Sequence, residues 1–354
     1  MATRAFRNRD LQLRDYTHLC GTARERQVVS ALPIVDRFVE IKSLRGRRDF
    51  NPTHYRELYG NSFPNPDERS PWSAMIGSVG DMNHIDHSAK LQAKYRHLRY
   101  HDVVALKGRA VAGFTSFATM PLESGKSVVY DLYTGVADRL FMLGTYGIDT
   151  EFRSRGIAHY FYVLRHGMAE EDGRKLGYSS EVAGTMLESE MIGQANDEQS
   201  IRNTRTRLQI HQRMGALVLM IDAGSDCWIT PHLQPKLSDD SNPLLMHLLF
   251  RRLQADGVHL NHICEIDREL ATSFLRAYIY SFEHQSTTTE IDEMRSNTDS
   301  RLAAGKRFIL VPPDKLPDMV TLASNDPLLR EQIERDYGSF DGHARKVKQV
   351  LGQL

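Results

Sequence analysis

A short glycine turn between two apolar runs constrains this chain more than any other feature of its sequence. Arg153-x-x-Gly156-x-Ala158 follows a strand-like run over 140–148 and precedes a helix-like run, Ile157–Leu176. Such a turn presents several backbone N–H groups at a helix N-terminus, where the helix dipole also favours negative charge. Gly156 matters because a side chain there would block the close approach of a ligand to the backbone. The turn therefore predicts a binding site for a diphosphate.

The same stretch resembles the acyl-CoA-binding signature of the GNAT superfamily of N-acetyltransferases, roughly V-x-P-x-[YF]-R-x-[RK]-G-[IVL]-[GA]. Ile148 stands at the valine position, and Thr150 replaces the proline. The other positions match the pattern and are filled by Phe152, Arg153, Arg155, Gly156, Ile157 and Ala158. The resemblance covers about residues 38–235 and implies a GNAT fold with acyl-CoA bound at the turn.

The elements expected around the signature follow the order of a GNAT domain. Apolar and β-branched residues at 102–105 and 110–117, with a turn between them, predict an antiparallel hairpin. The other expected elements are strands at 38–44, 128–132, 140–148, 178–183, 217–221 and 227–230, and helices at 53–60, 157–176 and 198–213. The predicted fold class is α/β (α+β), a mixed twisted sheet flanked by helices.

The composition of the chain shifts beyond residue 235. A Ser-Asp-Asp-Ser-Asn-Pro segment at 238–243 predicts a linker, and the expected elements after it are helices at 244–253, 266–282 and 327–336 and a strand at 308–311. We therefore expect three parts: an N-terminal arm at 1–37, a GNAT acyltransferase domain at 38–235 and a mostly helical C-terminal extension at 236–354. The extension fits a lid, a dimerisation element, a dock for a carrier protein or a helical layer on the core.

The resemblance implies which residues hold the donor. The backbone of 153–158, Ser154 included, would bind the CoA diphosphate, and Arg153 and Arg155 could add charge. Near Ile148 the family splays two central strands, and free backbone groups there bind pantetheine and polarise the thioester carbonyl. Acetyl-CoA is the default donor, used as a co-substrate.

The leaving thiolate needs a proton donor. In many family members this donor is a tyrosine in a late-helix pattern, L-Y-x-x-x-G-F, which the segment from Leu208 to Ala216 resembles, with His211 at the tyrosine position. Histidine can protonate a thiolate near neutral pH, because its unperturbed pKa is about 6.5. His211 could instead cap or pack the helix. Other hydroxyl donors are Tyr160, Tyr162 and Tyr178.

The acceptor amine needs a base. Glu181 lies in the strand expected after the signature helix, where the resemblance implies an acceptor-side carboxylate, and Asp131 and Tyr146 are alternatives. A chain of water molecules serves as the base in many family members. Glu181 could also be a solvated carboxylate at a strand edge.

Charge and cysteine content exclude several other classes. Lys+Arg equals Asp+Glu, 45 each, so no overall field favours nucleic acid or an anionic membrane. Cys20, Cys227 and Cys264 lie far apart and are odd in number, which argues against a disulfide framework. No apolar run approaches the ~20 residues of a membrane span, and the N-terminus lacks the apolar core of a signal peptide. We expect a cytoplasmic protein.

Two histidine pairs have helical spacing but no obvious partner cluster. They are His84 with His87 and His259 with His262, and we expect no metal at either pair.

The predicted function is acyl transfer from a CoA thioester to the amine of a small molecule, by direct attack and without a covalent enzyme intermediate. One alternative keeps the fold and changes the donor to a longer acyl chain or to an acyl carrier protein. Another is a non-catalytic module that binds acyl-CoA. A homodimer is also compatible with the sequence.

Overall fold

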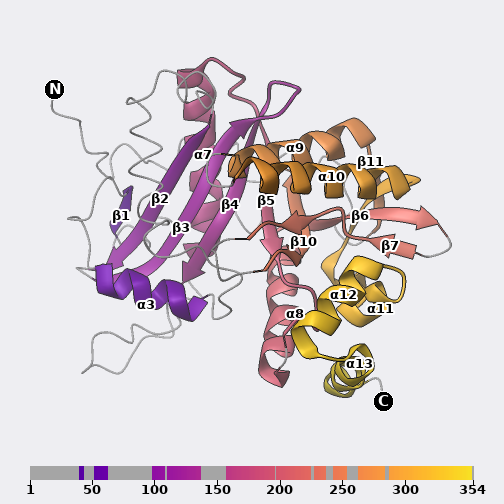
Figure 1. Ribbon diagram of the computed structural model, residues 1–354. Coiled ribbons are helices and arrows are strands. Elements are labelled where there is room, and N and C mark those ends of the chain that lie inside the picture. Colours follow the sequence, from indigo (N-terminus) through magenta and orange to yellow (C-terminus); the bar gives the residue numbers. More distant parts are fainter. Residues whose placement is uncertain are drawn as a thin grey trace, which may run out of the picture. The chain divides into compact units, whose positions relative to one another are not determined.

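The computed structural model describes residues 40–43, 52–62, 98–107, 110–136, 157–195, 197–224, 227–236, 242–252, 262–283 and 287–352. These residues form two compact units. Their helices and strands are labelled in Figure 1. Unit 1 contains the described residues up to Thr185, and unit 2 contains those from Met186 onward. Strand β5 (Val182–Ser189) is divided between the two units.

The sheet of unit 1 runs in the order β1-β2-β3-β4-β5. Its first four strands are β1 (Glu40–Ser43), β2 (Arg99–Lys107), β3 (Ala110–Pro121) and β4 (Ser127–Val136). The pairs β1–β2, β2–β3 and β3–β4 are antiparallel, with Val104 opposite Phe114 across the β2–β3 hairpin. The hairpin predicted from 102–105 and 110–117 is thereby confirmed.

Helices α3 (Pro52–Ser62) and α7 (Ile157–Leu176) cover opposite faces of this sheet. The ring of Tyr55 in α3 lies 4.8 Å from that of Phe114 on β3. The Arg165 guanidinium of α7 donates to Oγ1 of Thr115, the next residue of β3, at 3.2 Å. Because consecutive strand residues point to opposite faces, the two helices enclose the sheet between them.

The sheet of unit 2 runs in the order β5-β10-β6-β12-β11, with β7 paired to β6. Its further strands are β6 (Leu217–Gly224), β7 (Cys227–Ile229), β10 (His247–Arg252), β11 (Cys264–Ile266) and β12 (Arg307–Val311). Strands β8 (Leu233–Gln234) and β9 (Leu244–Leu245) form a separate antiparallel ribbon. Strand β6 is thus flanked by β10 and β12, both from beyond residue 236.

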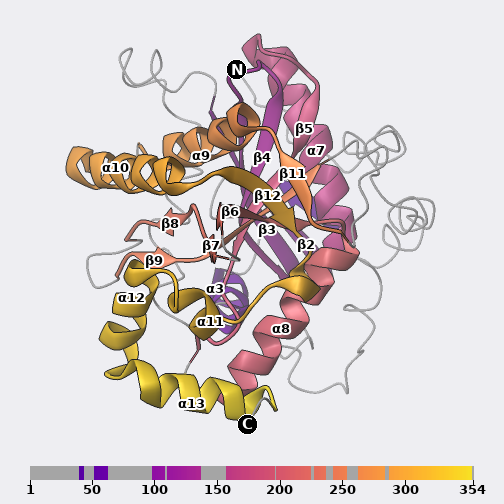
Figure 2. The ribbon, with the colours of Figure 1, turned by 90° about the vertical axis from the view of Figure 1, so that its right-hand side faces the viewer.

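The helices of unit 2 begin at capping residues. They are α8 (Glu198–Arg213), α9 (Arg268–Phe282), α10 (Thr288–Ala304), α11 (Met319–Ala323), α12 (Pro327–Tyr337) and α13 (Phe340–Val350). Their N-caps are Asp197, Asp267, Thr287, Asp318, Asp326 and Ser339, whose side chains accept bonds from backbone N–H groups that the helix leaves open. A 3₁₀ turn at Pro313–Lys315 lies between β12 and α11. Helices α9 and α10 lie side by side (Figure 2).

Most predicted elements are confirmed. The expected helices at 157–176 and 198–213 have the observed bounds of α7 and α8, and those at 53–60, 266–282 and 327–336 correspond to α3, α9 and α12. The expected strands at 38–44, 128–132, 217–221, 227–230 and 308–311 correspond to β1, β4, β6, β7 and β12. The predicted α/β class, a mixed sheet flanked by helices, is confirmed. The expected strand at 140–148 lies outside the described residues.

Two predicted elements were wrong. The strand expected at 178–183 begins only at Val182, because α7 runs to Leu176, Gly177 follows it with φ +81°, and the N–H of Tyr178 still bonds to the Gly173 carbonyl. The helix expected at 244–253 is instead β9 and β10, and Leu248 pairs with Leu219 of β6. A short apolar run fits either a buried strand or a helix, and pairing with a distant strand decides between them.

Candidate functional site

The predicted phosphate-binding turn leads into α7. Tyr146, Ile148 and the signature residues Arg153, Ser154, Arg155 and Gly156 lie outside the described residues. Helix α7 begins at Ile157, directly after Gly156, so Ile157 and Ala158 are its first two residues. The N–H groups of a first helical turn have no partner within the helix, and this turn contains no acidic residue that would repel an anion.

Buried polar contacts fix α7 on the sheet of unit 1. Arg165 is fully buried, and its guanidinium lies 4.3 Å from the centre of the Tyr162 ring. His166 Nε2 and Thr185 Oγ1 share a hydrogen bond of 2.6 Å, which joins the helix to β5. His101 Nε2 of β2 lies 2.7 Å from Asp172 Oδ2. Arg165, His166 and Asp172 thus anchor the middle and later turns of α7 on the sheet of unit 1.

Glu181, the predicted base, lies just before β5. Its carboxylate pairs with the Lys126 ammonium, and about half of its side chain is exposed. Its backbone carbonyl accepts from the Ser127 N–H at 2.8 Å. In this structure Glu181 is therefore a solvent-facing, charge-paired carboxylate at the end of a strand.

His211, the predicted proton donor, lies in the last turn of α8 and is half-buried. Its carbonyl accepts from the N–H groups of Met214 and Ala216, both at 3.0 Å, so its backbone helps to end the helix. His211 belongs to unit 2 and Glu181 to unit 1. Of the alternative donors, Tyr162 is buried and Tyr178 is half-buried.

A hydrogen-bond network in unit 2 was not predicted from the sequence. His232 Nε2 donates to Glu188 Oε1 at 2.6 Å, and the Tyr278 hydroxyl donates to the same oxygen at 3.0 Å. The Gln234 side-chain amide lies 3.4 Å from Glu188 Oε2. We call these four residues the Glu188 network. A carboxylate inside an apolar strand was the available signal, but the misplaced bounds of β5 left Glu188 outside the expected strand.

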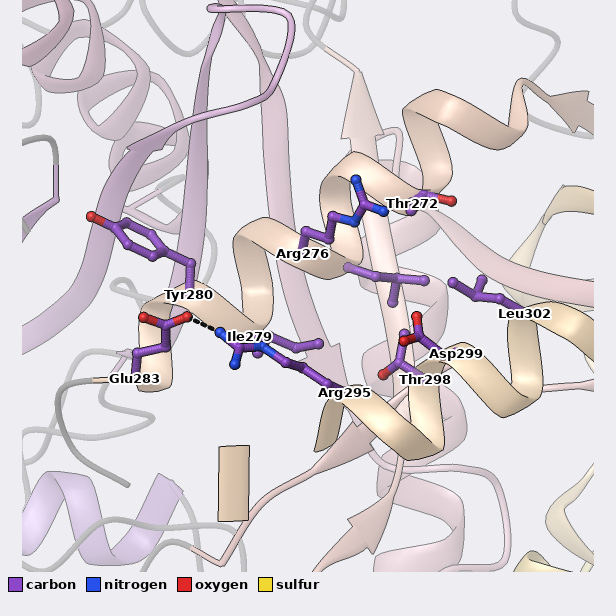
Figure 3. Close-up of a pocket in the computed structure, with 10 residues that line it drawn as sticks. Thr272, Arg276, Ile279, Tyr280, Glu283, Arg295, Thr298, Asp299 and Leu302 are labelled. Atoms are coloured by element: carbon purple, nitrogen blue, oxygen red, sulfur yellow. Dashed lines mark hydrogen bonds and ion pairs between the residues drawn. The ribbon is translucent and has the colours of Figure 1, made fainter. Parts of the chain in front are cut away.

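A cavity of about 360 Å³ lies between α9 and α10 (Figure 3). Its volume is within the range of small-molecule sites. Its apolar lining comes from Leu275, Ile279 and Leu302, and the Glu283–Arg295 ion pair lies at one end. Arg276 and Asp299 also line it, so its two arginines and two acidic residues balance in charge.

Among the described residues, Cys227 and Cys264 form no disulfide, and no three His, Cys, Asp or Glu side chains are grouped to hold a metal ion. His84, His87, His259 and Cys20 lie outside the described residues. None of the described helices is both long and apolar enough to cross a bilayer.

No protein-family model matches this chain, and no curated protein matches it. Among solved structures, a putative GNAT-family acetyltransferase from Bacteroides thetaiotaomicron is 15% identical over 66% of this chain and 94% of its own, with a TM-score of 0.33. A putative GNAT-family acetyltransferase from Desulfovibrio desulfuricans is 13% identical over 61% and 99%, with a TM-score of 0.30. The aminoglycoside 6′-N-acetyltransferase from Enterococcus faecium is 9% identical over 61% and 98%, with a TM-score of 0.28.

The fold class follows from the sheet and helices described above. The signature residues stand directly before α7, and β5, α8 and β6 follow that helix in order. In its signature and in this order of elements, the chain resembles the GNAT superfamily of N-acetyltransferases.

Proposed function

We propose that this protein is an acyl-CoA-dependent N-acyltransferase that moves an acyl group, by default acetyl, to the amine of a small molecule. The observation that supports this most directly is the start of α7 at Ile157, one residue after Gly156 of the signature. The signature's glycine thus precedes a helix N-terminus that has no acidic residue in its first turn and is fixed on a sheet. Backbone N–H groups at such a terminus suit a diphosphate.

The chemistry is direct attack of a neutral amine on the thioester carbonyl. Residues 153–158 are the proposed holders of the CoA diphosphate, and backbone groups near Ile148 the proposed polarisers of the carbonyl. His211 remains the proposed donor to the leaving thiolate. Glu181, whose carboxylate pairs with the Lys126 ammonium, and Tyr146 remain the candidate bases.

Calorimetric titration of the purified chain with CoA, acetyl-CoA and a longer acyl-CoA tests the proposal. Wild type is expected to bind in the micromolar range, and Gly156→Val to lose at least tenfold in affinity, because a branched side chain would block the backbone. Gly342→Val in α13 is the matched control: an added Cβ there meets Ser339 only at ordinary contact distance, 3.5 Å.

The preferred donor length separates acetyl transfer from longer acyl transfer. Equal binding by wild type and a folded Gly156→Val variant would contradict the proposed loop. If none of the three CoA compounds binds, acylated carrier proteins become the donors to test. Donor binding without turnover across a broad panel of amines would indicate a non-catalytic acyl-CoA module.

A further inference from the structure

Two threonines line the cavity between α9 and α10, one from each helix (Figure 3). The buried residues of α10 that lie three or four positions apart share one face of the helix: Ile291, Met294, Thr298 and Leu302. Thr298 is the polar member of that apolar set. On α9, Thr272 precedes Leu275 and Ile279 at the same spacing. Because threonine is smaller than leucine or isoleucine, the two helices leave space where larger side chains would fill it.

The hydroxyl groups of these threonines are not satisfied by the protein. Thr298 is only 8% exposed, yet its hydroxyl forms no hydrogen bond with another described residue. The Thr272 hydroxyl, on the opposite wall, also has no hydrogen bond within the described part of the chain. A buried hydroxyl without a partner costs free energy, which a ligand that hydrogen-bonds to it would recover. A few such polar groups in an apolar lining are what orient a small molecule in a pocket.

Asp299 gives the cavity a negative charge that no described residue neutralises. Of the four charged residues in the lining, Glu283 and Arg295 form an ion pair, and Arg276 is engaged in an interaction of its own. The Asp299 carboxylate has neither an ion pair nor a hydrogen bond with a described residue. Figure 3 shows Asp299 beside Thr298, away from the Glu283–Arg295 pair. A cation at this end would therefore find both a counter-ion and a hydroxyl.

We propose that the cavity between α9 and α10 binds a small primary amine with an apolar chain, in its ammonium form. An ammonium has several N–H donors, so it can donate to the Asp299 carboxylate and to the Thr298 hydroxyl together. The chain lies against Leu275, Ile279 and Leu302, and its burial drives binding. All of these residues belong to unit 2, and the inference does not rest on the acyl transfer proposed above.

Titration of the purified chain with hexylamine, hexanol and hexanoate at pH 7, followed by ligand NMR, tests the proposal. The three probes share one chain length and differ in the charge of the head group, and hexylamine is an ammonium at this pH. For so few atoms we expect a Kd of about a millimolar. Hexylamine should bind about fivefold more tightly than hexanol, because a partly exposed ion pair adds a modest gain. Hexanoate should bind most weakly, since Asp299 repels it.

Four variants separate the space from the charge. Thr298→Ile fills the cavity and should weaken hexylamine binding at least about tenfold, whereas Thr298→Val keeps the volume and should lose less. Asp299→Asn should make the Kd of hexylamine equal to that of hexanol. Glu293→Gln is the matched control for charge: it removes a negative charge from the exposed face of α10 outside the cavity and should change neither Kd.

Two outcomes would overturn the proposal. Equal affinity of wild type for hexylamine and hexanol would remove the preference for a cation. Equal hexylamine binding by wild type and a folded Thr298→Ile variant would place the amine elsewhere, and Thr272→Ile, from the α9 wall, decides this point if Thr298→Ile does not fold. No CoA compound enters these titrations, so their failure leaves the proposed acyl transfer standing, and a failure of CoA binding leaves this site standing.

Discussion

Two buried histidines of unit 2 differ in whether their ring nitrogens form hydrogen bonds. His232 and His247 are both almost fully buried. His232 donates to the Glu188 carboxylate, whereas neither ring nitrogen of His247 has a hydrogen-bond partner among the described residues. From the sequence alone both are titratable side chains near a change of composition. Their roles follow from strands and loops that the sequence separates, so they could not be assigned before the fold was known.

At the scale of single residues, we predict that neutral His247 contributes to the free energy of unfolding and that this contribution is lost in acid. Its pKa is lowered from 6.5 to about 3 in the folded state, so the folded protein disfavours the charged imidazole. The contribution is fully present above pH 6.5 and is lost as pH falls toward 3, at up to about 1.4 kcal/mol per pH unit. His247→Leu should flatten the pH dependence of the free energy of unfolding across this window, measured by urea denaturation at several pH values. Identical slopes for variant and wild type would contradict the assignment.

Helices were predicted more accurately than strands because their ends are marked locally. The bounds of α8 follow from Asp197, which accepts from the Ser200 N–H at 2.8 Å, and from Gly215, which has φ +88° after the helix. Strand β10 carries no such mark, since a run of Leu and Phe is stable in a helix or in a strand. Its pairing with β6, some 30 residues earlier in the sequence, selects the strand.

At the scale of single helices and strands, we predict that the N-cap of α8, Asp197, stabilises the folded protein. Asp197→Ala should lower the free energy of unfolding by about 1 kcal/mol at pH 7, because an N–H of the first turn loses its acceptor. Asp197→Asn keeps an acceptor and should cost much less. The hydrogen bond from Ser200 lowers the pKa of Asp197 below 3.8, so its stabilisation is complete above 3.8 and is lost as pH falls through the lower, folded value. Denaturation at pH 7 and pH 3 measures both effects, and equal losses for Ala and Asn would refute the cap.

A buried ion pair joins two helices of unit 2 that are separate in the sequence. In unit 2, Arg301 of α10 and Asp326, the N-cap of α12, form a buried ion pair with an N–O distance of 2.8 Å. Burial lowers the pKa of Arg301 and raises the pKa of Asp326, although each charge acts on the other in the opposite direction. Burial thus opposes both charges, and removing one partner would leave the other charge buried without its counter-ion.

We therefore predict strong coupling between these two positions. Arg301→Met should cost about 3–5 kcal/mol, since it leaves the Asp326 carboxylate buried without its partner. Asp326→Asn in the same chain keeps a helix-capping side chain and removes the charge, so the double variant should recover most of the loss. A double-mutant cycle of urea unfolding measures the coupling, and additive losses would contradict it.

The sequence by itself determined the α/β class, the β2–β3 hairpin, the bounds of α7 and α8, and the signature before α7, because periodicity, caps and glycine turns act over a few residues. The tertiary structure decided which strands flank β6, where β5 begins, and which groups surround Glu188. His232 and Tyr278 reach Glu188 from 44 and 90 residues away in the chain. Local preferences hold no information about such pairings, and only the burial of apolar strands and helices against one another selects them.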